Sequence, residues 1–391
     1  MAAIITDQFR IINANNFMDD VTSGNNSYYA FLGLANPTYA GFGRTDTWNS
    51  TTVQPPSPTD NIEYTNHTYD TMLFGRKVFP GDVRRLINKI NWTKGTSYDM
   101  YRHDYSSTSR SLVSNSSRLY SSNYYVMNKD YRVYICINNG AAGISTVASA
   151  SLDEPTFTDL EPSAAGVSGD GYLWKYLFTV PPADIVKFDS TEYIAVPNDW
   201  STSTDTDITV VRNNGDSDVN NNQIKVVSID EAGAGYAFLS SPIEVDIIGD
   251  GTGAKVRILT NTNGQIISAQ VTNGGFGYSY GRVDLSSING SATKFARLTP
   301  IIPPSRGHGF DLYKELGTDK VLIYTRFDSS SYDFASDTIF AQVGLIRNPT
   351  AIGAAGTNFL QTSEFSALKS FKFTGDTSQV LGIGTAITQN I

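Results

Sequence analysis

Cysteine and histidine are scarce in this chain, and their scarcity excludes several kinds of site. Cys136 is the only cysteine among 391 residues, so an intramolecular disulfide and a thiolate zinc site are both excluded. The three histidines, His67, His103 and His308, lie far apart and lack HxH or HxxxH spacing. We interpret them as isolated residues of polar loops, because a metal site or a catalytic triad needs several such groups to converge. We therefore expect no metal and no cofactor, and folding in a reducing cytoplasm.

Charge is also sparse, and long apolar runs are missing. Only 17% of residues are charged, and the net charge is −9. The longest basic run is Arg84-Arg85, whereas nucleic-acid binding needs a clustered basic surface, so we expect no nucleic-acid partner. No window approaches 18 uncharged apolar residues, and the first ten residues lack the regions of a signal peptide. We expect no membrane partner; an acidic, weakly charged surface fits a soluble protein that binds other proteins.

Evidence for catalysis is equally thin. Two carboxylate pairs, Asp153/Glu154 and Asp159/Glu161, lie in a polar loop, and a glycosidase uses two carboxylates at a fixed separation. The segment 249–253 is glycine-rich, but no Lys-Ser/Thr pair and no helix follow it, so we interpret it as a hairpin turn. We expect no enzyme and no catalytic residue. A polysaccharide-degrading enzyme remains an alternative that rests on the loop carboxylates alone.

Aromatic residues and glycine are plentiful, which favours strands and turns. The chain has 22 Tyr, 20 Phe and 33 Gly. Its length allows two or three domains. We predict a mainly β or α+β protein in which residues 1 to about 78 form only short strands. The clearest strand candidates are 28–34, 131–137, 172–180, 192–197, 321–327 and 339–346.

One segment has the periodicity of a helix. It begins after Pro80-Gly81, where Asp82 is placed to cap it. Its apolar positions have i, i+3, i+4, i+7 spacing, namely Val83, Leu86, Ile87 and Ile90. The sequence therefore predicts an amphipathic helix packed on a sheet.

The most informative segment predicts a turn, a strand and a stop. Gly169, Asp170 and Gly171 are typical of a tight turn, and Pro181-Pro182 cannot continue a ladder of hydrogen bonds. Between them, large side chains alternate on one strand face, namely Tyr172, Trp174, Tyr176, Phe178 and Val180. The opposite face is apolar enough to be at least half covered. Such a strand belongs in a core or against another subunit.

An internal repeat occupies residues 224–300. Its two copies begin with Val227–Tyr236 and Ala269–Tyr278, and each contains a Gly-X-Gly-Tyr motif followed by two short strands. We predict a small β domain of two similar hairpin units.

Several of these segments resemble one known family, the baseplate wedge subunits of T4-type phages, which are the products of gene eight. The blocks occur in the same order: Phe42-Gly43-Arg44 with Trp48, 55–60, 77–92, 169–182, 192–197 and 340–349. The most specific block is 169–182, and its motif residues are Gly169, Asp170, Gly171, Tyr172, Trp174, Tyr176, Phe178, Pro181 and Pro182. The repeat departs from that family and resembles modules in structural proteins of marine T4-like phages.

The resemblance implies a structural role without catalysis. Members of the family are dimers in each wedge of a contractile-tail baseplate, where they contact other wedge proteins. The implied location is the tail of the virion, after assembly in the host cytoplasm. The implied fold is a β-sandwich core with α+β domains inserted into its loops. We predict the core at 1–78 with 301–391, an inserted α+β domain at 79–215, and the β-repeat module as a further insertion at 216–300. The nine motif residues are then structural. A receptor- or glycan-binding tail protein remains an alternative, because the chain is rich in tyrosine and carries the Gly-X-Gly-Tyr repeat.

Overall fold

The computed structural model describes residues 5–34, 72–141, 148–216, 222–288, 292–327, 340–350 and 358–366. The chain is mainly β, with several antiparallel sheets and few helices, as the sequence predicts. It divides into two compact units, one of Met1–Thr22 with Pro80–Tyr324 and one of Ser23–Phe79 with Thr325–Ile391. The three-domain division stays a prediction.

The smaller unit contains one four-stranded sheet with the order β15-β1-β2-β16. Its strands are β1 (Tyr28–Leu34), β2 (Met72–Lys77), β15 (Phe340–Arg347) and β16 (Glu364–Ser366). The sheet thus joins segments from both ends of the chain. Two strand glycines leave room for aromatic rings: a Cβ added at Gly75 would lie 2.1 Å from Phe365, and one at Gly344 would lie 2.3 Å from Phe31.

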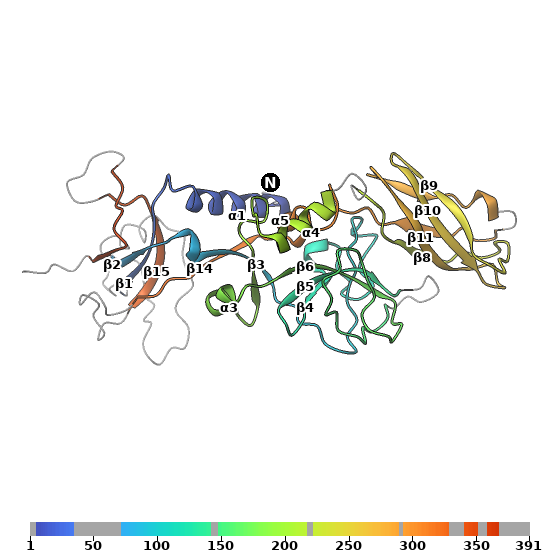
Figure 1. Cartoon of the computed structure of the whole chain (residues 1–391), viewed down its shortest axis with the longest axis horizontal. Helices are drawn as coiled ribbons and strands as arrows, with labels where there is room; N and C mark the ends of the chain where they lie inside the picture. The colour runs from blue at the N-terminus through green and yellow to red at the C-terminus, as the bar shows by residue number, and fades with distance from the viewer. Residues whose placement is uncertain are drawn as a thin grey trace, which may run out of the picture. The chain divides into compact units, whose positions relative to one another are not determined.

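The larger unit contains two three-stranded sheets and, from residue 227 onward, the repeat (Figure 1). One sheet consists of β14 (Lys320–Ile323), β3 (Val83–Asn88) and β7 (Tyr193–Val196), with β3 in the middle. The other consists of β4 (Tyr125–Met127), β5 (Arg132–Asn139) and β6 (Tyr172–Thr179). The helices of the unit are α1 (Asp7–Thr22), α3 (Pro182–Phe188), α4 (Thr206–Asp216) and α5 (Leu312–Leu316), with 3-10 turns η1 (Pro80–Asp82), η2 (Leu119–Ser121) and η3 (Ser286–Ile288).

The helix predicted after Pro80-Gly81 is wrong, because β3 occupies those residues. Only the single turn η1 precedes it. Strand β3 pairs with β14 on one edge and with β7 on the other, so its backbone is satisfied by non-local partners. Val83, Leu86 and Ile87 are all buried, because both faces of the strand are covered. In a short strand that is buried on both faces, apolar residues can fall at the spacing of a helix. The periodicity of this segment therefore does not distinguish a helix from a strand.

The expectation of only short strands before residue 78 is also wrong, because α1 fills Asp7–Thr22. It buries one face on β3, β14 and α5, through Ile11, Ala14, Met18 and Val21. The buried Arg85 of β3 contacts both α1 and α5: Nε donates to Asn15 Oδ1 of α1 at 2.8 Å, and the guanidinium lies 4.1 Å from the centroid of the Tyr313 ring of α5. Burial lowers the pKa of Arg85. Asn and Asp residues, which are weak helix formers, obscure this helix in the sequence.

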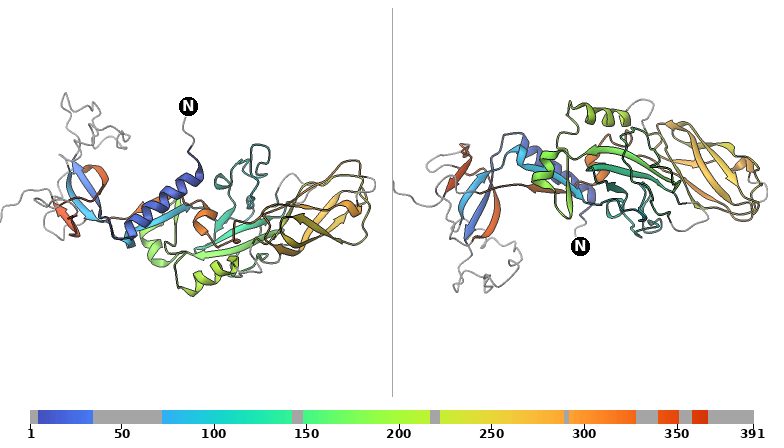
Figure 2. Two further views of the ribbon diagram at one scale, coloured as in Figure 1. Left: turned by 90° about the horizontal axis from the view of Figure 1, so that it is seen from above. Right: turned by 60° about the horizontal axis from the view of Figure 1, so that its bottom comes forward.

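The two copies of the repeat form one interlocked β module. Its strands are β8 (Val227–Glu231), β9 (Ile243–Gly249), β10 (Thr252–Thr260), β11 (Ile266–Phe276), β12 (Gly281–Val283) and β13 (Arg297–Pro300). The first strand of each copy pairs with the last strand of the other: Ile229 lies opposite Leu298, and Val271 lies opposite Val256. Both views of Figure 2 show the yellow and orange strands of this module lying side by side. Neither copy is therefore a self-contained hairpin unit.

The tyrosine of each Gly-X-Gly-Tyr motif joins the two copies. Tyr236 Oη accepts from Ala296 N at 2.8 Å, and Tyr278 Oη accepts from Ala254 N at 3.1 Å. Both tyrosines are buried. Gly275 has φ +59°, and an added Cβ would lie 2.8 Å from the Tyr278 ring, so the motif needs glycine to fold the ring back.

Removing the two tyrosine hydroxyls should have unequal effects on the free energy of unfolding. Tyr278 Oη also donates to Ile247 O at 3.2 Å, so Tyr278→Phe leaves two buried backbone groups unpaired. We expect a loss of about 1–3 kcal/mol for Tyr278→Phe and about 1 kcal/mol for Tyr236→Phe. Urea unfolding of both variants measures the difference. Equal losses would contradict the proposed bonding.

A buried arginine connects the module to the rest of the larger unit. Arg102 donates to Asp230 Oδ1 of β8 at 2.7 Å, to Asp104 Oδ2 at 2.8 Å and to Ser228 Oγ at 2.9 Å. Burial alone would raise the pKa of Asp230, but the hydrogen bonds from Arg102 outweigh burial and lower it. The module is therefore attached through a charged contact as well as through the chain.

Candidate functional site

The turn before β6 depends on its two glycines and on the aspartate between them. Gly169 has φ +68° and Gly171 has φ +86°. The Asp170 carboxylate accepts from Tyr172 N at 3.0 Å and from Leu152 N at 2.8 Å. A Cβ added at Gly171 would lie 2.8 Å from the Cα of Gly140, so the two backbones touch here. The Gly-Asp-Gly motif thus fixes the start of the strand.

The aromatic face of β6 is buried, as its alternation predicts. Tyr172 and Trp174 stack with centroids 5.4 Å apart, and Tyr98 meets Trp174 edge-on at 5.8 Å. Farther along, Tyr176 packs edge-on against Tyr134 at 5.8 Å. The indole Nε1 of Trp174 has no hydrogen-bond partner within the described part of the chain, so packing alone holds this ring.

The middle of the other face of β6 is buried too, and it carries a lysine. Lys175 is only 3% exposed. Its Nζ donates to Asn214 Oδ1 at 3.0 Å and to the carbonyl oxygen of Leu160. Burial lowers the pKa of Lys175 to about 8, although Glu161 nearby favours the charged form. The middle of the strand is therefore enclosed on both sides. Burying the Lys175 amine is energetically unfavourable, and its hydrogen bonds offset part of that cost.

A groove of about 740 Å³ lies where β6 ends. Of the nine motif residues, the structure brings Tyr176, Phe178, Pro181 and Pro182 to its lining. The other five lie toward the start of the strand, in the turn and the core described above. The groove is also lined by η1, by residues 197–199 after β7 and by the start of α4.

Aspartates give this groove its charge. Four line it, Asp184, Asp199, Asp205 and Asp207, against the single cation Arg84. Arg84 is already paired with Asp184, since Nη2 lies 2.9 Å from Oδ1. Asp205 Oδ1 accepts from Asp207 N at 2.9 Å and so caps α4. Asp199 and Asp207 are exposed, and the printed sequence gives no local pattern that would place them together.

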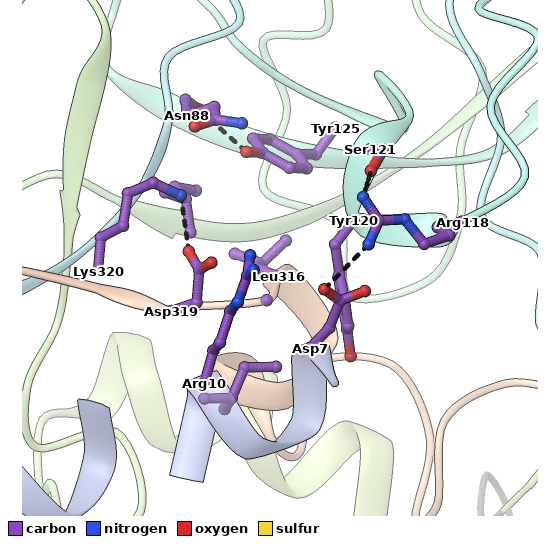
Figure 3. Close-up of a pocket in the computed structure, with 13 residues that line it drawn as sticks. Asp7, Arg10, Asn88, Arg118, Tyr120, Ser121, Tyr125, Leu316, Asp319 and Lys320 are labelled. Carbon is purple, nitrogen blue, oxygen red and sulfur yellow. Dashed lines mark hydrogen bonds and ion pairs between the residues drawn. The ribbon is translucent and has the colours of Figure 1, made fainter. Parts of the chain in front are cut away.

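A second, smaller pocket of about 180 Å³ lies at the start of α1. Figure 3 shows Arg10 pointing into it between two ion pairs. Asp319 lies 2.7 Å from Lys320 Nζ, and Asp7 lies 3.5 Å from Arg118. Positive and negative side chains thus alternate around the wall of this pocket. Their ion pairs indicate a polar contact surface at the start of α1 and not an active site.

The residues considered for catalysis do not form a catalytic cluster. Glu161 pairs with Lys225 Nζ at 2.6 Å, and the Asp153 carboxylate accepts from Ser168 N at 2.7 Å. His308 is buried with its Nδ1 2.6 Å from Glu315 Oε1, and His103 Nδ1 accepts from Ile302 N. His67 lies outside the described residues.

Other classes of site receive no support either. Asp250 belongs to the turn predicted at 249–253, where its carboxylate accepts from Ser279 N and Tyr280 N. Within the described ranges, no group of three or more His, Cys, Asp or Glu side chains is placed to hold a metal ion. Over those same ranges, no helix combines the length and the apolar character needed to cross a membrane.

Substituting the two turn glycines should separate steric contact from backbone strain. Gly171→Ala combines a left-handed φ with a backbone clash, so we expect a loss of about 2–5 kcal/mol in unfolding free energy. Gly169→Ala is the matched control, because its Cβ would meet nothing within 4 Å. It should cost about 1 kcal/mol through strain alone. Thermal and urea unfolding measure both; similar losses would contradict the close approach to Gly140.

The buried Lys175 should make stability rise with pH. Its folded pKa of about 8 lies below the unfolded value of 10.5, so the unfolded chain binds more protons between these values. We expect its contribution to increase by about 2 kcal/mol from pH 7 to pH 9.5. Lys175→Met should remove this rise, whereas the exposed Lys129→Met should keep it. Comparing urea unfolding of the wild type and each variant cancels the other titrating groups; equal slopes for all three would refute the assignment.

Comparison with known proteins gives one informative result. No protein-family model matches the chain. A stretch of 216 residues, 50% of this chain, is 27% identical to the baseplate wedge protein gp8 of Enterobacteria phage T4. That stretch covers 60% of the T4 protein, so the likeness extends over only part of each protein. Over this half of its length, the chain is homologous to the T4 baseplate wedge protein gp8.

Proposed function

We propose that this protein is a structural subunit of the contractile-tail baseplate wedge of a T4-like phage, where it acts by assembly with other wedge proteins and not by catalysis. The observation that carries the proposal is the homology to gp8 of phage T4. Its location is then the virion tail, and its partners are a second copy of itself and neighbouring wedge proteins.

Features of the described residues support this role. Asp153, Glu161, His103 and His308 are engaged in separate local contacts, and the groove at the end of β6 is lined by aspartates, prolines and buried aromatic residues. Large apolar side chains are exposed on several elements, including Phe9 of α1 and Val343 of β15. Partner proteins in a wedge would remove such side chains from water.

Reconstitution with its wedge neighbours tests the proposal. The purified chain should have a solution mass of twice the 42.6 kDa monomer, and it should join a stable complex when co-expressed with the other wedge proteins of its phage. Light scattering and native mass spectrometry measure the two results. Failure to join any wedge complex would overturn the proposed role; a monomer that dimerises only in the complex would overturn the free dimer alone.

A receptor- or glycan-binding tail protein is the second candidate, and one observation favours it. The module exposes four aromatic side chains, each more than half exposed: Phe238, Phe276, Tyr280 and Phe295. Exposed rings stack on the apolar faces of sugars as they do on other flat ligands. This candidate predicts a trimer and binding on a glycan array. A dimer without glycan binding would exclude it.

A further inference from the structure

We propose that the groove at the end of β6 is a docking site for an extended, basic segment of another wedge protein. The inference rests on the proposed function and adds to it a surface and the chemistry of a partner. Three observations carry it: the size and construction of the groove, its unbalanced negative charge, and the spread of that charge.

The groove is large and firmly built. Its volume of about 740 Å³ lies within the range of sites that enclose a ligand, about 300–1,000 Å³. The buried Tyr176 and Phe178 belong to the core as well as to the groove. Next to them, Pro181 and Pro182 restrict the backbone. A preformed groove of this kind lowers the entropic cost of ordering a bound segment.

The opposite wall is held by hydrogen bonds. Asn198 Oδ1 accepts from Arg85 N at 3.3 Å, and Asn198 Nδ2 donates to Val83 O at 2.5 Å. The neighbouring Trp200 is buried, and its Nε1 donates to Gly309 O at 2.9 Å. Asp199 stands between these two anchored residues, so its exposed carboxylate is presented from a fixed backbone.

The charge of the lining selects a basic occupant. Four aspartates and one arginine leave an excess of three negative charges, and the arginine is already paired with Asp184. The N-terminus of α4, which would attract an anion, is already capped by Asp205. Phosphates, nucleic acids and acidic peptides are therefore repelled, whereas Lys and Arg side chains are attracted.

The spread of these carboxylates favours a chain segment over a metal ion. No metal-binding group of three or more side chains occurs among the described residues, although three lining aspartates remain after the Arg84 pair is discounted. The lining carboxylates come from three places in the fold, namely α3, the segment after β7 and the start of α4, and basic side chains spaced along an extended segment would pair with them. The prolines and the half-buried Ile208 offer apolar surface for the aliphatic stems of Lys and Arg.

Charge reversal within a reconstituted wedge complex tests the inference. The groove variant is Asp199→Lys with Asp207→Lys, and Asp205 is spared because it caps α4. The matched control is Asp159→Lys with Glu192→Lys, which reverses two exposed carboxylates outside the groove lining. Unfolding curves establish that all three proteins fold. Each is then titrated with the wedge proteins of the same phage, and the complexes are measured by native mass spectrometry and by analytical ultracentrifugation at 50 and 500 mM NaCl.

We expect the wild type and the control to join the complex equally, and the groove variant to bind about tenfold or more weakly. The affinity of the wild type should fall with salt, and that of the groove variant should change little. Equal binding of the groove variant and the control would overturn the docking site while the proposed function stands. A wild type that joins no complex would overturn the proposed function, and the docking site with it. A groove variant that fails to fold is replaced by Asp199→Asn with Asp207→Asn, for which the same ranking is expected.

Discussion

Burial of the middle of β6 on both faces is the constraint on which the larger unit depends. Four aromatic rings fill one side of the strand, and the buried Leu177 and Lys175 lie on the other. A strand enclosed in this way needs close partners at both ends. At one end Gly171 touches Gly140, and at the other Pro181 stops the ladder where α3 begins. The single buried amine is tolerated because Leu160 O and Asn214 Oδ1 replace its water.

Two buried arginines join α1 and the repeat module to the rest of the larger unit. Arg85 of β3 donates a hydrogen bond to Asn15 of α1 and makes a cation–π contact with the ring of Tyr313 in α5. Helix α1 is therefore held by this hydrogen bond as well as by its apolar face. Arg102 links the core to Asp230 of the repeat module. Guanidinium groups suit both positions, because one planar group can satisfy several acceptors at once. Loss of Arg102 would leave the mostly buried Asp230 carboxylate with its neutral donors Ser228 and Thr299 but without its main charged partner.

Local patterns in the sequence were sufficient where a segment's own residues determine its structure. The alternation after Gly171 predicted β6, and the Gly-X-Gly-Tyr motifs predicted the strands of the module, because turn chemistry and period-two burial are local. The spacing after Asp82 does not predict β3, because the pairing of this strand with β7 and β14 is non-local. The interlocking of the repeat was equally hidden, since the partner of each strand lies in the other copy. The acidic groove joins Asp184, Asp199 and Asp207, which only the tertiary fold brings to one surface.

The motif residues of β6 and of the segment that follows it fall into two groups, one buried in the core and one exposed in the groove lining. Tyr172 and Trp174 are wholly buried, so packing alone accounts for them. Pro181 and Pro182 are exposed in the groove lining, where core packing needs neither. Ending the strand requires only one proline, and Pro182 sits at the first position of α3, where it costs no hydrogen bond. The two exposed prolines are therefore the motif residues that the proposed docking segment would contact, because they lie in the groove lining together with the exposed Asp199 and Asp207.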